Sequence, residues 1–234
     1  MPSKVPRGLR NRSCLFRVIP RSVLSSIFVT ACAAAVVPKA AAAKNFEKPV
    51  AHPAKTYPAH DDHEDEKVAF AADPYDNAEK AKIFSVNFAE HGFLPVFFVV
   101  TNEGDQPISI ANMAITLIKP RTAKLTPVSS EDIYRRLTNP QGGTRPSSIP
   151  IPRKNVKGAI TQRERDEIES SQFAAKAVEP HSSQSGFLFF DVEGVSSPLA
   201  GANINITGID DAKGNELMFF EIPMDNSLTP AAKQ

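Results

Sequence analysis

The 234-residue sequence contains no tryptophan and only two cysteines. Both cysteines, Cys14 and Cys32, lie within the first 43 residues. The chain after residue 43 therefore has no disulfide and must be held together by a hydrophobic core. Its length of about 190 residues is sufficient, because domains of that size bury most of the surface that their unfolded chains expose.

Catalytic motifs are also absent. The sequence has no nucleophile elbow, no Ser-Lys pair, no His-Glu-x-x-His segment and no glycine-rich loop that would cradle a phosphate. Asp73 and Asp76 flank Pro74, which is typical of a turn rather than of paired acid–base catalysts. We therefore predict that the protein is not an enzyme and requires no cofactor.

Acidic residues are missing from the first 43 positions, which carry seven Lys and Arg. Basic residues dominate positions 1–21, positions 22–37 are uncharged and mostly apolar, and positions 40–43 are alanines. A basic region, a short apolar core and a small-residue exit predict a secretory signal peptide over residues 1–43. The apolar core is shorter than the about 20 residues that a membrane-spanning helix needs.

Two cleavage sites fit this signal peptide. Residues 41–43 (AAA) before Lys44 suit ordinary signal peptidase, whereas residues 29–32 (VTAC) resemble a bacterial lipobox in which Cys32 would be lipidated. Both alternatives predict a periplasmic or secreted protein, and the second adds a lipid anchor at Cys32 as its one contact with the membrane.

Removal of residues 1–43 leaves an acidic chain. The whole sequence has a formal net charge of +1, and the removed segment accounts for seven positive charges and no negative ones, so −6 remains. An acidic domain outside the cytoplasm is not expected to bind nucleic acid.

Most of the remaining chain carries strand and turn signals. Residues 44–66 contain three prolines and an acidic end, so we expect a flexible acidic tether. Residues 67–222 alternate short apolar segments with turns, which predicts about eight strands of an antiparallel β-sandwich. The most distinct signal, in residues 92–110 (GFLPVFFVVTNEGDQPISI), is strand–turn–strand. Other strands are predicted at 83–88 and 216–222, followed by a loose tail at 223–234.

Residues 129–177 interrupt the β pattern. Ser130 is suited to cap a short helix that ends near Leu137. Residues 161–177 favour a second helix, solvated but with a weak apolar seam. Residues 138–157, between the two helices, are rich in Pro, Gly and Ser and predict a long loop. This helical and loop excursion separates the two halves of the predicted sandwich.

Three predicted strands are apolar at consecutive positions, 96–100, 187–190 and 217–220. A strand of a two-layer sandwich needs apolar side chains at alternate positions only, so these segments indicate burial on both faces. Two interpretations of the second face are open. The helices of residues 129–177 cover it as a third layer, or it is an exposed Phe patch that docks a partner.

Two segments carry a family resemblance. Residues 99–108 (VVTNEGDQPI) resemble the TN-x-G-x-x-P-I strand and turn of bacterial extracytoplasmic immunoglobulin-like domains, and residues 179–192 (EPHSSQSGFLFFDV) resemble their later P-x₅-G-x-L-x-F-x-V strand. Residues 67–222 are similar in style to uncharacterised secreted proteins of Acidobacteria-like bacteria. The resemblance implies an all-β, antiparallel immunoglobulin-like β-sandwich with a helical insertion, and no catalytic set.

A cluster of histidines and carboxylates is the first candidate site. His60 and His63 lie three residues apart, with Asp61 and Asp62 between them. Imidazole and carboxylate groups suit Zn²⁺ or Cu²⁺, so a metal-binding envelope protein is the alternative function. The competing interpretation is a solvated run of charge.

A basic segment is the second candidate site. Residues 133–163 contain no acid, and their segregated positive charge in an acidic chain suggests a patch that binds an envelope protein or an anionic component of the cell surface. The other interpretation is that this segment folds back on the protein's own carboxylates. The sequence thus predicts a non-enzymatic extracytoplasmic binding module of unknown ligand. The proposed partner-binding residues are Arg135, Arg136, Arg145, Arg153, Lys154 and Lys157.

Overall fold

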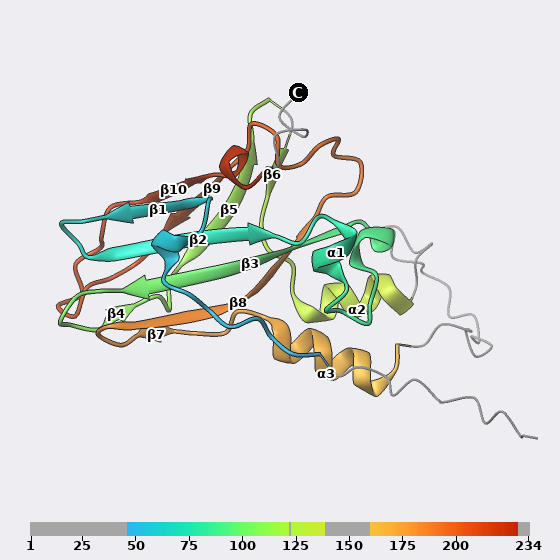
Figure 1. The fold of residues 1–234 in the computed structure, drawn as a ribbon, viewed down its shortest axis with the longest axis horizontal. Helices are drawn as coiled ribbons and strands as arrows, with labels where there is room; N and C mark the ends of the chain where they lie inside the picture. Colours follow the sequence, from blue (N-terminus) through green and yellow to red (C-terminus); the bar gives the residue numbers. More distant parts are fainter. Residues whose placement is uncertain (1–45, 122, 139–159, 229–234) are drawn as a thin grey trace, which may run out of the picture. The chain divides into compact units, whose positions relative to one another are not determined.

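Two four-stranded antiparallel sheets form the body of the computed structural model, which describes residues 46–121, 123–138 and 160–228 (Figure 1). The first sheet consists, in spatial order, of β1 (His60–His63), β2 (Val68–Pro74), β3 (Phe93–Asn102) and β8 (Ser182–Asp191). The second consists of β10 (Phe220–Pro223), β9 (Asn203–Thr207), β5 (Ala114–Lys119) and β6 (Ala123–Leu125). A two-stranded ribbon pairs β4 (Ile108–Ser109) with β7 (Ala177–Val178).

The helices of the described residues are short. They are α1 (Ala78–Ala81), α2 (Ser130–Thr138), α3 (Gln162–Ser171) and the 3₁₀ turns η1 (Ala54–Thr56), η2 (Phe88–His91) and η3 (Met224–Ser227). None of those within the described ranges is long and apolar enough to cross a membrane.

The two sheets share a hydrophobic core. On β3, Val96, Phe98 and Val100 belong to this core, together with inward side chains of the second sheet such as Leu117 of β5 and Ile204 of β9. Since β5, β9 and β10 alternate buried and more exposed positions, the second sheet is buried on one face.

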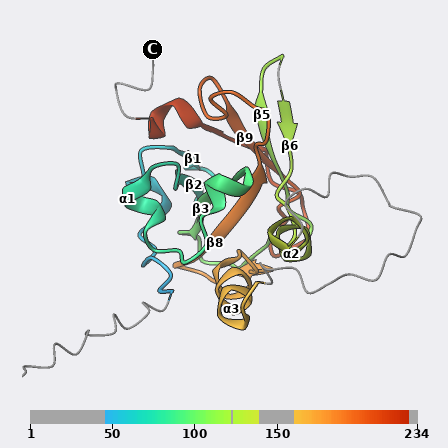
Figure 2. The same cartoon turned by 90° about the vertical axis from the view of Figure 1, so that its right-hand side faces the viewer.

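A third layer covers the other face of the first sheet. The alternate residues Phe97 and Val99 of β3 pack there with Ile133 of α2, Ile168 of α3 and Phe84 of the segment after α1. All ten positions of β3 are buried. The prediction that the strands at 96–100 and 187–190 are buried on both faces is confirmed, and the helices, lying side by side in Figure 2, supply the cover.

Residues 83–88 differ from the predicted strand. Asn77 caps α1, its side chain accepting a hydrogen bond from the Lys80 amide, and the chain then passes beneath α3 to η2. The amides of Ser85 and Val86 donate to the Glu167 carboxylate of α3 instead of to a neighbouring strand. The apolar alternation in this segment therefore serves helix packing rather than a sheet.

The expected flexible tether is also different in the structure. Phe46 stacks on Phe84 at 5.5 Å, η1 follows, and residues 60–63 form β1, fully paired with β2. Edge strands tolerate polar side chains because their backbone hydrogen bonds, rather than apolar burial, hold them in the sheet. Because residues 60–63 are polar, the sequence predicted a flexible tether where the structure has an edge strand.

The remaining differences concern the ends of elements. The helix predicted at 161–177 ends at Ser171, and Ala177 belongs to β7. β4 pairs with β7 rather than with β3, so residues 92–110 contain the predicted two strands and turn but not a hairpin. The last strand starts at Phe220, four residues later than predicted. The proposed signal peptide with Cys32, the loop at 139–159 and the tail after residue 228 lie outside the described residues.

Candidate interaction surfaces

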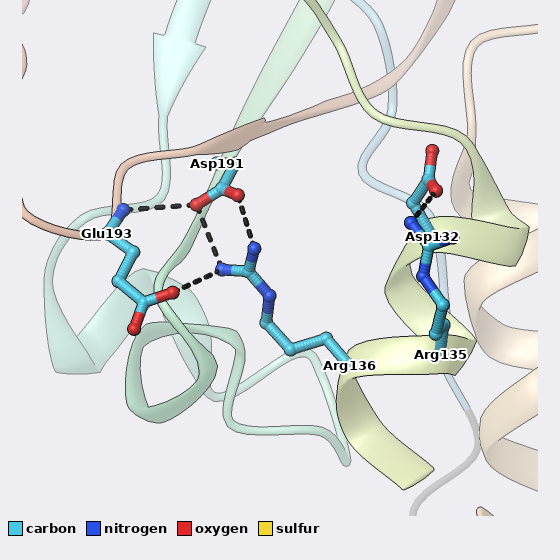
Figure 3. Close-up of polar contacts among 5 residues, drawn as sticks. All are labelled: Asp132, Arg135, Arg136, Asp191 and Glu193. Atoms are coloured by element: carbon cyan, nitrogen blue, oxygen red, sulfur yellow. Dashed lines mark hydrogen bonds and ion pairs between the residues drawn. The ribbon is translucent and has the colours of Figure 1, made fainter. Parts of the chain in front are cut away.

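Helix α2 carries Arg135 and Arg136, the two proposed partner-binding residues that the structure describes. Its start is set by Ser129 rather than by Ser130, because the Ser129 hydroxyl accepts a hydrogen bond from the Asp132 amide and donates to the Asp132 carboxylate. One turn later, Arg135 and Arg136 point to different surroundings (Figure 3).

Arg136 is held by the first sheet. Its guanidinium donates to both carboxylate oxygens of Asp191 at the end of β8 and to Glu193 at 3.0 Å, and it lies 4.9 Å from the ring centre of Phe93 (Figure 3). The hydrogen bond with Asp191 raises the pKa of Arg136. Its side chain is only 28% exposed. Arg136 therefore fastens α2 to the sheet and is not free for a ligand.

Arg135 remains on the surface. Its side chain is 69% exposed and pairs with Asp132 one turn earlier, at 2.5 Å (Figure 3). Such an exposed pair within one helix leaves the guanidinium accessible. Arg145, Arg153, Lys154 and Lys157 lie outside the described residues, so a basic binding patch stays a prediction that only Arg135 supports within them.

The predicted histidine cluster lies on β1, where alternation separates its members. His60 and Asp62 share one face of the strand, whereas Asp61 and His63 share the other. Lys55 also approaches Asp62, at 3.5 Å, which disfavours a cation there. The described residues contain no group of three or more His, Cys, Asp or Glu side chains arranged to hold a metal ion.

His63 instead belongs to the contact between the two sheets. Its ring stacks on Phe220 of β10, with 4.0 Å between the ring centres. Nδ1 lies 3.0 Å from a Glu66 oxygen, and Nε2 lies 3.7 Å from an Asp61 oxygen. The two carboxylates thus approach opposite ring nitrogens and cannot join one nitrogen as ligands of a single ion.

The same two carboxylates satisfy the free edge of the second sheet. Asp61 accepts a hydrogen bond from the Glu221 amide at 2.7 Å, and Glu66 accepts one from the Met218 amide at 3.0 Å. β10 is an edge strand, and side-chain acceptors take the place of a neighbouring backbone. We name this contact, residues 60–66 with residues 216–221, the acidic seam.

The acidic seam contains exposed apolar side chains. Met218 is 66% and Phe219 55% exposed, and Val50 is the one other large apolar residue that is exposed in the described ranges. Sequence reasoning missed this pair because residues 217–220 were predicted to be a strand buried on both faces. The ladder of β9 and β10 ends at Ile206 and Phe220, so Met218 and Phe219 lie beyond it.

Glycine geometry explains where this ladder ends. Gly208, two residues after Ile206, has a φ of +74°, and a Cβ there would approach the Asn112 carbonyl oxygen to 2.4 Å. The chain therefore turns out of β9 at this point, and the Leu217 amide bonds to Ile209 instead of continuing the regular pairing.

A shallow cavity of about 280 Å³ lies between Phe46 and helix α3. Its lining includes Arg163, Asp166, Glu167 and Ser170, but the Glu167 carboxylate is already occupied by the amides of the segment after α1. The lining residues include no histidine or cysteine, so this cavity offers no nucleophile paired with a base.

Comparisons with protein-family models, with curated proteins and with solved structures found no match to this chain.

Proposed function

We propose that the protein is a non-enzymatic binding module of the bacterial cell envelope, exported from the cytoplasm and built on an immunoglobulin-like β-sandwich. The observation that carries this proposal is the exposed pair Met218–Phe219. Large apolar side chains left together on a surface with a polar surround are typical of protein contacts. The expected partner is an envelope protein.

The surroundings of the pair support a binding role. The other large apolar side chains that the sequence placed on sheet faces, including those of β3 and β8, are buried in the two cores. Met218 and Phe219 thus remain exposed, whereas the phenylalanines of β2, β3 and β8 are buried between the sheets or under the helical layer. Burial of both side chains by a partner would contribute about 2–4 kcal/mol.

The use of the polar groups supports binding rather than chemistry. Glu167 is taken by backbone amides, Arg136 by Asp191, and Asp61 and Glu66 by the edge of β10. Each of these groups already stabilises the fold. A catalyst needs groups that are free to change partners during a reaction.

The immunoglobulin-like assignment is supported by the resembling motif. Asn102, the asparagine of TN-x-G-x-x-P-I, accepts a hydrogen bond from the Gly104 amide and donates to the Gln106 and Val178 carbonyls. One side chain thereby shapes the turn after β3 and joins it to β7, which gives this motif residue a structural role.

Photo-crosslinking tests the proposal. A photo-reactive amino acid replaces Phe219 in the full-length protein, expressed in a bacterial host, and a second version carries it at Val50 as the control. We expect a discrete crosslinked species from position 219 in the extracytoplasmic fraction and none from position 50. Retention of the protein in the cytoplasm, no crosslink, or equal crosslinking at both positions would overturn the proposal.

A further inference from the structure

We infer that the partner meets the acidic seam with a cationic polypeptide segment that carries a large apolar side chain. This inference rests on the proposed function and adds the chemistry of the partner. The inference follows from the negative charge of the side chains around Met218 and Phe219.

Apart from His60 and His63, every titratable side chain within the two segments of the seam is acidic. Residues 60–66 and 216–221 include no Lys and no Arg. Hydrogen bonds from the Met218 and Glu221 amides place the two segments against each other. The carboxylates of the seam are Asp61, Asp62, Glu64, Asp65, Glu66, Glu216 and Glu221.

The nearby cations compensate only part of this charge. Lys55 divides its charge between Asp62, at 3.5 Å, and Glu103, at 3.0 Å. Lys67, next to the seam, lies 3.8 Å from Asp105. Glu64 and Asp65 have no ion-pair partner among the residues that the structure describes. The seam therefore has unneutralised negative charge at its exposed turn.

Backbone contacts fix the apolar pair within this charge. The Met218 amide is tied to Glu66, and the next residue but one, Phe220, is buried and stacked on His63. Phe219 lies between these two fixed points. A rigid apolar anchor loses little conformational entropy on binding, and a surrounding acidic field favours a positively charged partner and repels a negative one.

These features select one kind of occupant. Anionic lipid headgroups and acidic glycans would be repelled by the carboxylates. A polypeptide in which Lys or Arg flanks a Leu or Phe is complementary to this surface. Its apolar side chain would cover Met218 and Phe219, and its cations would approach the unpaired carboxylates.

A peptide titration followed by NMR tests the inference. The ¹⁵N-labelled protein spans residues 43–234, which form one compact unit. The probe is a twelve-residue peptide in which Lys alternates with Leu and Phe, and the control peptide has Gln in place of Lys. We expect amide shifts centred on residues 60–66 and 216–221, and affinity at least about tenfold higher for the Lys peptide.

Matched variants separate the two contributions. Met218→Ser with Phe219→Ser should weaken binding about tenfold or more, and Glu64→Gln with Asp65→Asn should weaken it about threefold to tenfold. Val50→Ser, an exposed apolar residue elsewhere, should leave it within about twofold. Far-ultraviolet circular dichroism of each variant checks that its secondary structure is unchanged.

Several results would overturn the inference. They are shifts centred away from the seam, equal binding of the Gln peptide, insensitivity to the Met218 and Phe219 changes, or a seam occupied by a second copy of this chain in sedimentation experiments. If crosslinking from position 219 still captures an envelope protein in those cases, the proposed function stands and the assigned partner chemistry is wrong.

Discussion

The Glu167 carboxylate of α3 accepts hydrogen bonds from both the amide and the hydroxyl of Ser85, at 2.9 Å and 2.5 Å, across 82 positions of sequence. Glu167 is 3% exposed, whereas Ser85 lies at the surface, so these bonds are partly buried. They dock the helical layer on the segment that covers the Phe-rich face of the first sheet. A buried carboxylate here organises packing.

Glu167→Ala should therefore destabilise the protein. The Ser85 and Val86 amides lose their acceptor, and a buried unsatisfied donor costs about 1–3 kcal/mol. Urea unfolding of residues 43–234 measures the change. Asp166→Asn, at an exposed neighbouring position on α3, is the control and should change the free energy of unfolding by less than about 0.5 kcal/mol. Equal effects of the two changes would contradict this role.

Arg136→Lys should also destabilise the protein, although the replacement keeps the charge. Lysine cannot reproduce the two-pronged contact with Asp191, and the stacking on Phe93 is weakened. We expect a loss of about 1 kcal/mol in the free energy of unfolding, a value that allows for solvent at the partly exposed Asp191.

Arg135→Lys, one position earlier on the same helix, is the matched control for Arg136→Lys. It should change stability by less than about 0.5 kcal/mol, because its pair with Asp132 is exposed. Denaturant titrations of the two variants make the comparison. A larger effect at position 135 would show that α2 is not fastened through Arg136.

Two tyrosines should make stability depend on alkaline pH. Burial raises the pKa of Tyr75 to about 12, and burial with the hydrogen bond to Glu169 raises that of Tyr134 to about 12. Between about pH 10, where an unfolded tyrosine ionises, and pH 12, the unfolded state loses these protons first. The contribution of these two tyrosines to the free energy of unfolding is therefore fully present below about pH 10 and is lost as the pH rises to about 12.

An absorbance titration of tyrosinate measures this effect. Native protein should show late ionisation for these two side chains, and Tyr134→Phe should remove one of the late transitions. In urea, the tyrosines of the unfolded protein should ionise with the ordinary pKa of about 10. A native titration that is complete by about pH 10.5 would contradict the buried positions.

Gly186→Ala tests the crossing of two backbone segments. A Cβ at Gly186 would lie 2.4 Å from the Phe173 Cα and 2.6 Å from its nitrogen, and the Phe173 amide bonds to the Phe187 carbonyl beside it. The three nearest atoms are all backbone atoms of Gln172 and Phe173, so no flexible side chain can move to make room. We expect a loss of about 2 kcal/mol or more in thermal or urea unfolding. Ser185→Ala, the neighbouring position, should have a much smaller effect.

The sequence predicted the parts of the fold that are specified by apolar patterning. β3 and β8 were located because their consecutive Phe, Val and Leu residues allow little except burial on two faces. The third layer was one of the two interpretations that this patterning left open, and the structure bears it out. The capping box of α3, with Thr161 and Glu164, likewise agrees with the predicted helix start.

What the sequence could not predict depends on long-range backbone partners. β1 has polar side chains, and its register against β2 cannot be read from residues 60–63. Nothing in the sequence around Glu167 indicates that its carboxylate accepts hydrogen bonds from Ser85. The exposed pair in the acidic seam follows from where the pairing of β9 with β10 ends, at Ile206, two residues before Gly208. A strand end shifted by a few residues converts an expected core position into a surface position.

His63 distinguishes the structural interpretation of the histidine cluster from the metal-binding alternative. His63→Ala removes the ring that stacks on Phe220 between Asp61 and Glu66, so we expect a loss of about 1 kcal/mol in stability. His60→Ala should cost less, because its ring has no aromatic partner among the described contacts. Its contacts are with the Tyr57 carbonyl, 2.6 Å from Nδ1, and with Asp62, 3.8 Å from Nε2.

Metal titration of the same proteins completes the test. A metal that binds the native state raises stability with its concentration, by about 2.7 kcal/mol at a hundredfold excess over the dissociation constant. Because the ring nitrogens of His63 face different carboxylates, we expect Zn²⁺ or Cu²⁺ at micromolar concentration to leave the unfolding midpoint unchanged. Stoichiometric metal in protein purified without added metal, lost in the His60→Ala, His63→Ala double variant, would instead favour an envelope metal-binding protein.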